Sequence, residues 1–227
     1  FTIGANGATI DNSSSGLNFG NSGSLVVLGT SPILTLTGST MYSAYLTPVL
    51  ADPSGGTLSI LKTGTGTGAW VLYGSNTFTG TAIISSGTLV PGLSALTNSS
   101  LVRVDSGAML KLPDTAITSS PFTKEITLNG GILAGGTNNT KLYAINAPIT
   151  LTADSQIALS GGGGLTLQSL AVISGAYGVT YNGVIGGANY SSPINIDSAN
   201  TYTGTTTVSA GTLVVSGSGT LGATTNS

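Results

Sequence analysis

The hydrophobic residues of this chain occur in short runs spread along its whole length. Runs of Val, Ile, Leu and Thr cover residues 24–28, 33–37, 83–85 and 212–215, and each is closed by Gly, Ser, Asn or Pro. Short runs of strand-forming residues bounded by turn residues predict β-strands. No stretch shows the sustained spacing of an amphipathic helix. The pattern therefore predicts an all-β chain.

Two segments of the chain repeat each other. Asn-Thr-aromatic-Thr-Gly-Thr begins at Asn76 and again at Asn200, and a Gly-Thr-Leu-Val segment follows at the same distance in both copies. Agreement in both residues and spacing indicates a repeat architecture. The motif residues are Asn76, Thr77, Phe78, Gly80, Gly87 and Leu89 in the first copy, and Asn200, Thr201, Tyr202, Gly204, Gly211 and Leu213 in the second.

Strands this short cannot bury a face alone, but stacked coils can do so. Asn and Gly tolerate positive φ and are expected at the corners of such coils. The sequence thus predicts a right-handed parallel β-helix that forms one elongated domain over residues 1–227. Its clear repeat copies span about 58–92 and 186–217, and segments 39–56 and 113–125 are candidate protruding insertions.

Composition narrows the possible functions. Charged residues make up 5% of the chain, against roughly 25% in ordinary soluble domains. With 40% hydrophobic residues the chain is nevertheless expected to be ordered. Five Lys and Arg residues and a net charge of −2 argue against binding to nucleic acid. No apolar run is long enough to span a membrane as a helix.

The motif regions resemble a known family, the autotransporter-associated (passenger-associated) β-strand repeat. The resemblance is carried by Leu61-Lys62-Thr63-Gly64, by the Asn76 motif with its counterpart at Asn200, and by Gly87-Thr88-Leu89. The second copy lacks the Lys-Thr-Gly segment. The resemblance implies a β-helical stalk or passenger, extracellular or on a bacterial cell surface, and it brings no catalytic residues.

An enzyme is the least favoured alternative. Cys and His are absent, which removes thiolate ligands and the commonest general base, and no cofactor is predicted. Some β-helices cleave polysaccharides with converging carboxylates. The candidates here are Arg103, Asp105, Lys111, Asp114, Lys124 and Glu125. Their spacing fits no catalytic pattern, and we interpret them as charges that solvate an exposed loop.

Two aromatic residues, Tyr42 and Tyr45, are candidates for contact with a partner. They lie in segment 39–56, which interrupts the repeat. Exposed aromatic rings can stack on sugars or fill a pocket of a partner protein. The same segment could instead fold back over the coils, and the sequence leaves both possibilities open.

The favoured function is that of an extracellular structural solenoid, a rod or filament segment, with an adhesin that binds glycans or proteins as the alternative. The last residues, Thr225-Asn226-Ser227, followed by Phe1-Thr2-Ile3, echo Thr97-Asn98-Ser99 and the strand after it. This match predicts that copies continue head to tail, as tandem units or as stacked subunits.

Overall fold

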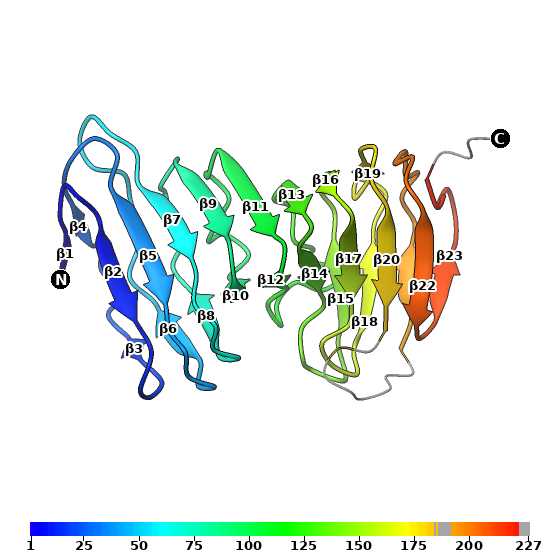
Figure 1. Cartoon of the computed structure of the whole chain (residues 1–227), viewed down its shortest axis with the longest axis horizontal. Helices are drawn as coiled ribbons and strands as arrows, with labels where there is room; N and C mark the ends of the chain where they lie inside the picture. Colours follow the sequence, from blue (N-terminus) through cyan, green and yellow to red (C-terminus); the bar gives the residue numbers. More distant parts are fainter. Residues whose placement is uncertain (184, 186–191, 223–227) are drawn as a thin grey trace. The chain divides into compact units, whose positions relative to one another are not determined.

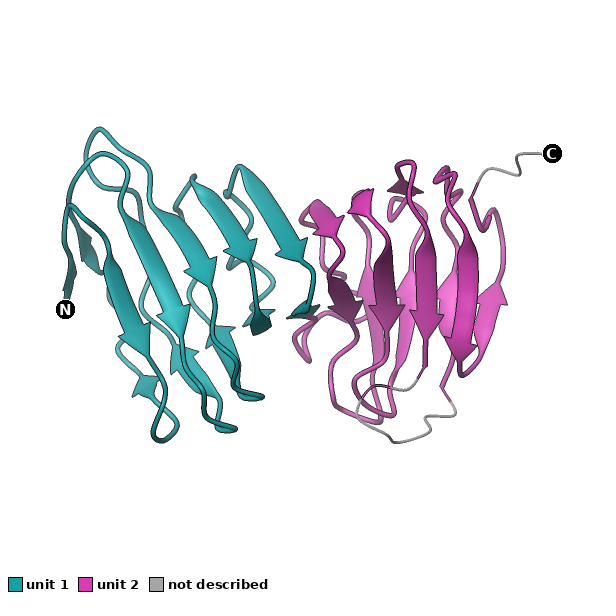
Figure 2. Cartoon of the chain, in the orientation of Figure 1, with its two compact units in different colours: residues 1–110 teal, residues 111–227 magenta. Residues whose placement is uncertain are grey.

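The computed structural model shows a chain of short parallel β-strands (Figure 1). It describes residues 1–183, 185 and 192–222. Within this part of the chain there are strands and no helix, which confirms the all-β prediction. The chain divides into two compact units, Phe1–Leu110 and Lys111–Ser227 (Figure 2).

In unit 1, consecutive strands enter different sheets, so the chain winds in coils. The first sheet of unit 1 contains, in order, β2 (Ala8–Asp11), β5 (Ile33–Thr37), β7 (Ser59–Lys62), β9 (Thr81–Ile84) and β11 (Leu101–Asp105). The second sheet contains β3 (Asn18–Phe19), β6 (Ala44–Leu46), β8 (Ala69–Leu72), β10 (Gly87–Pro91) and β12 (Ala108–Lys111), and β12 ends on the first residue of unit 2. A parallel pair joins β1 (Thr2–Ile3) to β4 (Val26–Val27).

Unit 2 repeats this construction with three sheets. One contains β13 (Ile126–Asn129), β16 (Ile149–Ala153) and β19 (Ile173–Ser174). A second contains β14 (Ile132–Ala134), β17 (Ser155–Ala158), β20 (Val179–Asn182) and β22 (Thr206–Ala210). The third contains β15 (Leu142–Ile145), β18 (Gly164–Leu167), β21 (Ile194–Ile196) and β23 (Leu213–Val215).

The core consists of like side chains stacked from coil to coil. In the first sheet of unit 1, Leu34 pairs with Ile60, Ile60 with Ala82, and Ala82 with Val102, and all four are buried. Each fully buried aliphatic side chain contributes roughly 1.5–3 kcal/mol. In unit 2, Ile149 pairs with both Ile126 and Ile173 in the same way. Stacked coils of parallel sheets confirm the predicted β-solenoid.

The two candidate insertions differ from each other. Segment 39–56 contains β6, which pairs with β3 and β8, so this part of the segment is a strand of the coil and does not bulge from it. Leu46 is buried there because it lies on the inner side of the sheet. Segment 113–125 lies between β12 and β13 and contains none of the strands, although its residues Ala116 and Phe122 are buried.

Candidate functional site

The asparagine of the first repeat lies at a buried corner and binds the coils on both sides of it. Asn76 is 4% exposed. Its side-chain oxygen Oδ1 accepts a hydrogen bond from the Leu50 amide of the preceding coil at 2.9 Å. Its nitrogen Nδ2 donates to the Ala95 carbonyl of the following coil at 3.1 Å. A carboxamide suits this position because it offers a donor and an acceptor on one short side chain.

The second repeat reproduces this geometry in unit 2. Asn200 is also 4% exposed. Its Oδ1 accepts from the Ile173 amide at 2.8 Å, and its Nδ2 donates to the Thr220 carbonyl at 2.7 Å. We call Asn76 and Asn200 the coil clamps. Buried backbone groups need partners, and the clamps supply them at a corner where the sheet ladder is interrupted.

The residues after each clamp continue the contact with the preceding coil. The amides of Thr77 and Phe78 both donate to the Leu50 carbonyl, at 2.9 and 3.2 Å. In the second copy, the amides of Thr201 and Tyr202 both donate to the Ile173 carbonyl, at 2.8 and 3.2 Å. The Phe78 and Tyr202 side chains are buried, with exposures of 1% and 0%. The aromatic position thus fills the coil interior beside each clamp.

The first glycine of each motif is required by close packing between coils. A Cβ atom on Gly80 would lie 2.2 Å from the Leu58 carbonyl oxygen, and one on Gly204 would lie 2.1 Å from the Tyr177 carbonyl carbon. Both distances are far below van der Waals contact.

The second glycine has a different reason. Gly87 and Gly211 have φ angles of 69° and 81°, in the left-handed region that favours glycine. Two residues later, Leu89 is fully buried and Leu213 is half-buried. The turn at each glycine therefore redirects the chain into a strand whose leucine faces the core.

The two motif segments match a known repeat in sequence. The model of the passenger-associated-transport-repeat family matches residues 62–90 and 195–215. These two segments are similar to passenger-associated-transport repeats. All twelve motif residues lie inside the two matches, and of the predicted second copy, 186–217, residues 186–191 lie outside the described part of the chain. A search of curated proteins found no match, and neither did a search of solved structures.

Lys62, the first residue of the first matched repeat, lies inside the coil. It is 2% exposed and pairs with Leu36 and Ile84, so it interrupts an aliphatic stack. Its ammonium donates to the carbonyls of Thr63 and Ser86, the latter at 3.1 Å. Burial lowers the pKa of Lys62 to about 8. The sequence alone gave no sign that this lysine is buried.

The burial of Lys62 predicts an unusual alkaline dependence of stability. Because its pKa is lowered in the folded chain, the unfolded chain binds more protons between about pH 8 and pH 10.5. The free energy of unfolding should therefore rise over this interval, by about 1–2 kcal/mol after screening by solvent. Lys62→Met should abolish this rise, measured as the difference between urea unfolding curves of the two proteins. Lys141→Met, a matched control, should keep the rise, and equal pH profiles for the wild type and Lys62→Met would contradict the prediction.

Asp52 forms a second link between coils that sequence reasoning missed. Its carboxylate accepts hydrogen bonds from the Leu58 amide at 2.8 Å, the Thr79 amide at 3.0 Å and the Thr79 hydroxyl at 2.6 Å. Partial burial raises the pKa of Asp52, but the hydrogen bonds from Thr79 and Leu58 outweigh this effect and hold the pKa below its ordinary value. Asp52 thus ties its own loop to the end of the first repeat motif.

Acidification should weaken this link. A carboxylate with a lowered pKa stabilises the fold above its ordinary pKa, and this contribution is lost as the pH falls through the folded value. Asp52→Asn should lower the free energy of unfolding at neutral pH by about 1 kcal/mol, because water competes at a partly exposed site. As the pH falls through the lowered pKa of Asp52, the difference from the wild type should shrink. Asp11→Asn, at an exposed position, serves as the control and should change little.

The charged residues considered as catalytic candidates have local partners. Arg103 donates to Asp105 at 2.8 Å on the outer side of β11. In unit 2, the Tyr143 hydroxyl donates to Asp114 at 2.5 Å. Burial and the bond to Asp114 raise the pKa of Tyr143, and burial lowers the pKa of Lys111, an effect that the charge of Asp114 partly offsets.

The last two candidates, Lys124 and Glu125, are half-buried and exposed respectively. Among the described residues, no three His, Cys, Asp or Glu side chains gather as a metal site would require.

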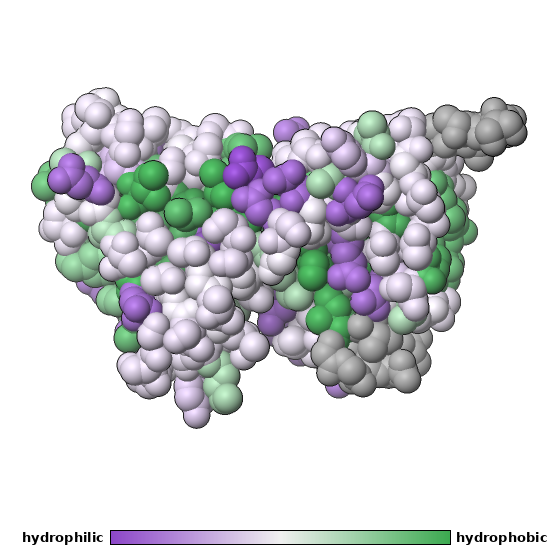
Figure 3. Space-filling model, in the orientation of Figure 1, coloured by the Kyte–Doolittle hydropathy of each residue, from purple (hydrophilic) through white to green (hydrophobic). Residues whose placement is uncertain are grey.

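The described part of the chain contains no apolar helix of the length that a membrane span needs. The face shown in Figure 3 is mostly pale and weakly polar, in keeping with a surface of Ser, Thr and Gly.

The aromatic candidates lie on the surface of unit 1. Tyr42 is 58% exposed, so it does not fold back over the coil. Tyr45 on β6 stacks on Tyr73, which follows β8, with ring centroids 5.9 Å apart and planes inclined by 4°. Tyr73 is 60% exposed, and sequence reasoning missed it. Tyr45 pairs with Val71 in the register between β6 and β8. Tyr73 lies two residues after Val71, and this spacing brings the two rings together.

Proposed function

We propose that this chain is a structural segment of an extracellular passenger, a β-solenoid that gives length and stiffness to a secreted or surface-exposed bacterial protein. The observation that carries the proposal is the coil clamp. In both repeats the motif asparagine binds the backbone of the coils before and after it. The motif residues thus serve coil stacking, and the family match to passenger-associated-transport repeats supports an exported protein.

The contacts of the charged residues support a non-catalytic role. Asp105 and Asp114 are engaged by Arg103 and Tyr143, in contacts that hold strands and loops together. We expect no cleavage of polysaccharides when the purified chain is incubated with a panel of neutral and uronic-acid polymers and the reducing ends are measured. Release of new reducing or unsaturated ends would contradict this role.

Labelling and electron microscopy of the source bacterium test the structural proposal. An antibody against the folded chain should bind intact cells or the culture medium. Negatively stained material bound by this antibody should contain rods or filaments. Labelling confined to lysed cells would overturn the proposal. Head-to-tail continuation of the coils stays a prediction, which the same images test through the length of the labelled particles.

Adhesion is the second candidate function, and the exposed tyrosines favour it. Tyr42, Tyr45 and Tyr73 present aromatic surface on one unit, and aromatic faces stack on sugar rings or anchor protein contacts. A glycan array should then give binding that Tyr45→Ala and Tyr73→Ala each reduce. Tyr177→Ala removes a tyrosine of unit 2 that is 43% exposed and serves as the control. Binding that survives both unit 1 variants would exclude this surface.

A further inference from the structure

Two tyrosines of adjacent coils stack on each other on the outer side of unit 1. Tyr45 lies on β6, and Tyr73 follows β8 in the next coil. Their ring centroids are 5.9 Å apart, and the ring planes are inclined by only 4°. The two residues are 36% and 60% exposed. We call them the tyrosine pair, in which two phenol rings lie side by side where solutes can reach both.

The strand register holds the tyrosine pair together. Side chains alternate along a strand, so Ala44 and Leu46, which are buried, set Tyr45 on the outer side of β6. Tyr45 pairs with Val71, and Tyr73 lies two residues later on the same outer side. The rings are therefore neighbours only while β6 and β8 are hydrogen-bonded. In the unfolded chain nothing keeps them close.

The following coil leaves the Tyr73 ring free to turn. Gly92 lies beside Tyr73 in that coil, and its amide donates to the Leu72 carbonyl at 2.7 Å. A Cβ atom on Gly92 would lie 3.9 Å from the Tyr73 Cα, but glycine has none. Exposed side chains change rotamer within nanoseconds. The edges of the two rings can therefore meet as well as their faces.

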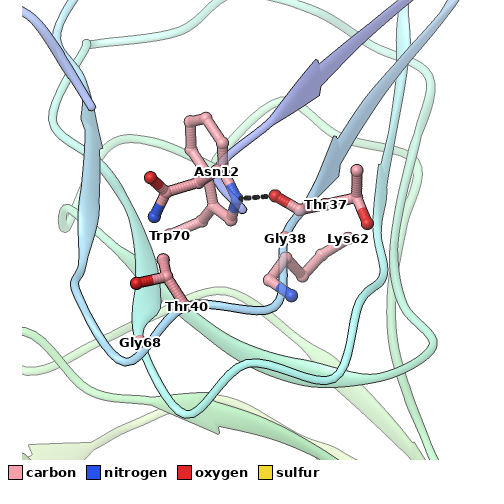
Figure 4. A pocket seen from close by; sticks show the side chains of 7 residues that line it. All are labelled: Asn12, Thr37, Gly38, Thr40, Lys62, Gly68 and Trp70. Atoms are coloured by element: carbon pink, nitrogen blue, oxygen red, sulfur yellow. Dashed lines mark hydrogen bonds between the residues drawn. The ribbon is translucent and has the colours of Figure 1, made fainter. Parts of the chain in front are cut away.

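Other side chains that could give up an electron are absent or shielded near the pair. The chain contains no cysteine, whose thiol would reduce a tyrosyl radical. Its one tryptophan, Trp70, is 2% exposed, and its Nε1 donates to the Thr37 carbonyl inside the coil (Figure 4). Met41 is exposed, but peroxide oxidises a thioether to a sulfoxide by oxygen transfer. A one-electron oxidant in solution thus reaches the tyrosine pair and not the indole.

We propose that the tyrosine pair is a site of oxidative cross-linking, at which Tyr45 and Tyr73 join two coils as a dityrosine. The oxidant is a haem peroxidase with hydrogen peroxide, and it removes one electron and one proton from each phenol. The two radicals couple through the ring carbons next to their hydroxyls, which forms one C–C bond. The hydrogens on these carbons move to the phenol oxygens and restore both hydroxyls. The chain loses two hydrogen atoms, and the peroxide is reduced to two water molecules.

The role of this cross-link rests on the extracellular location proposed above. A covalent bond between coils restricts the unfolded chain, as a disulfide does in other exported proteins. This chain has no cysteine and cannot form a disulfide. The bond from Tyr45 to Tyr73 closes a loop that contains β7, the strand of the buried Lys62. The cross-linked coils should therefore resist unfolding.

Peroxidase treatment of the purified full chain tests the site, and the result does not depend on where the protein is located. Trypsin cuts the unfolded chain after Lys62 and Arg103, which separates Tyr45 in peptide 1–62 from Tyr73 in peptide 63–103. Treated monomer should yield these two peptides joined, with two hydrogen atoms fewer than their sum. Fragment spectra should place the bond at Tyr45 and Tyr73. Two separate peptides would overturn the proposal.

Matched variants and an unfolded control complete the test. Tyr45→Phe and Tyr73→Phe should each abolish the joined peptide, whereas Tyr177→Phe, which alters an exposed tyrosine of unit 2, should keep it. Treatment in urea should lower its yield several-fold. A joined peptide in Tyr45→Phe would assign the bond to Tyr42, and equal yields from folded and unfolded chain would show that the fold does not bring the pair together. Either result would overturn the site.

The stability of the cross-linked chain tests its role separately. Cross-linked monomer should unfold at a higher urea concentration than untreated monomer, measured by circular dichroism. Treated Tyr73→Phe should show no such shift relative to untreated Tyr73→Phe. A joined peptide without any shift in the unfolding midpoint would overturn the stabilising role.

Discussion

Replacement of Asn76 by leucine is expected to lower the free energy of unfolding by about 3–5 kcal/mol. Leucine fills a similar volume but leaves the Leu50 amide and the Ala95 carbonyl without their partner. Each buried group that loses its hydrogen bond costs about 1–3 kcal/mol. Urea unfolding followed by circular dichroism measures the change.

The control for this variant is Asn98→Leu, which alters an exposed asparagine of the same unit and should shift the unfolding midpoint very little. Asn200→Leu should reproduce the loss seen with Asn76→Leu, because Asn200 forms the same two bonds with Ile173 and Thr220. Equal stability of Asn76→Leu and Asn98→Leu would show that the clamps do not hold the coils together.

Gly80→Ala should have the second large effect, a loss of about 3 kcal/mol. The added Cβ would meet the Leu58 carbonyl oxygen at 2.2 Å, and Leu58 belongs to the preceding coil. Since the obstacle is backbone, relief requires the two coils to separate, which strains the ladder between β7 and β9. The unfolding midpoint in urea and the protection of the Thr81 and Ala82 amides from hydrogen exchange should both fall.

Gly107→Ala separates steric collision from backbone strain. Gly107 has a φ of 80°, but a Cβ there would meet nothing within 4 Å. Only the left-handed conformation is penalised, so the loss should be about 1–2 kcal/mol. If Gly107→Ala proved as damaging as Gly80→Ala, close packing between coils would not be the reason for the first motif glycine.

Much of the fold could be predicted from the sequence because a solenoid repeats local patterns. The run at 33–37 coincides with β5 (Ile33–Thr37), and the run at 212–215 contains β23 (Leu213–Val215). The recurrence of Asn76 as Asn200 marked two corners with the same bonding. Strand residues that alternate between core and solvent, bounded by glycine, leave few other ways to bury apolar surface.

Segment 39–56 shows the limit of this reasoning. The segment interrupts the repeat pattern, so its sequence left an insertion open, yet Ala44–Leu46 forms β6. Three residues carry too little periodicity to be recognised alone, and only pairing with β3 and β8 makes them a strand. The same register placed Tyr73 beside Tyr45, a pair that is 28 positions apart in the chain.

The solenoid class, the positions of the two repeats and the scarcity of charge follow from local residue types and their spacing, so they could be predicted from the sequence alone. The environment of single polar side chains depends on tertiary contacts. Lys62 faces the core because the register of β7 sets it on Leu36 and Ile84, and Asp52 meets Thr79 across a coil. Whether a polar group is buried and bonded depends on neighbours one coil away, and a single sequence does not reveal which residues those are.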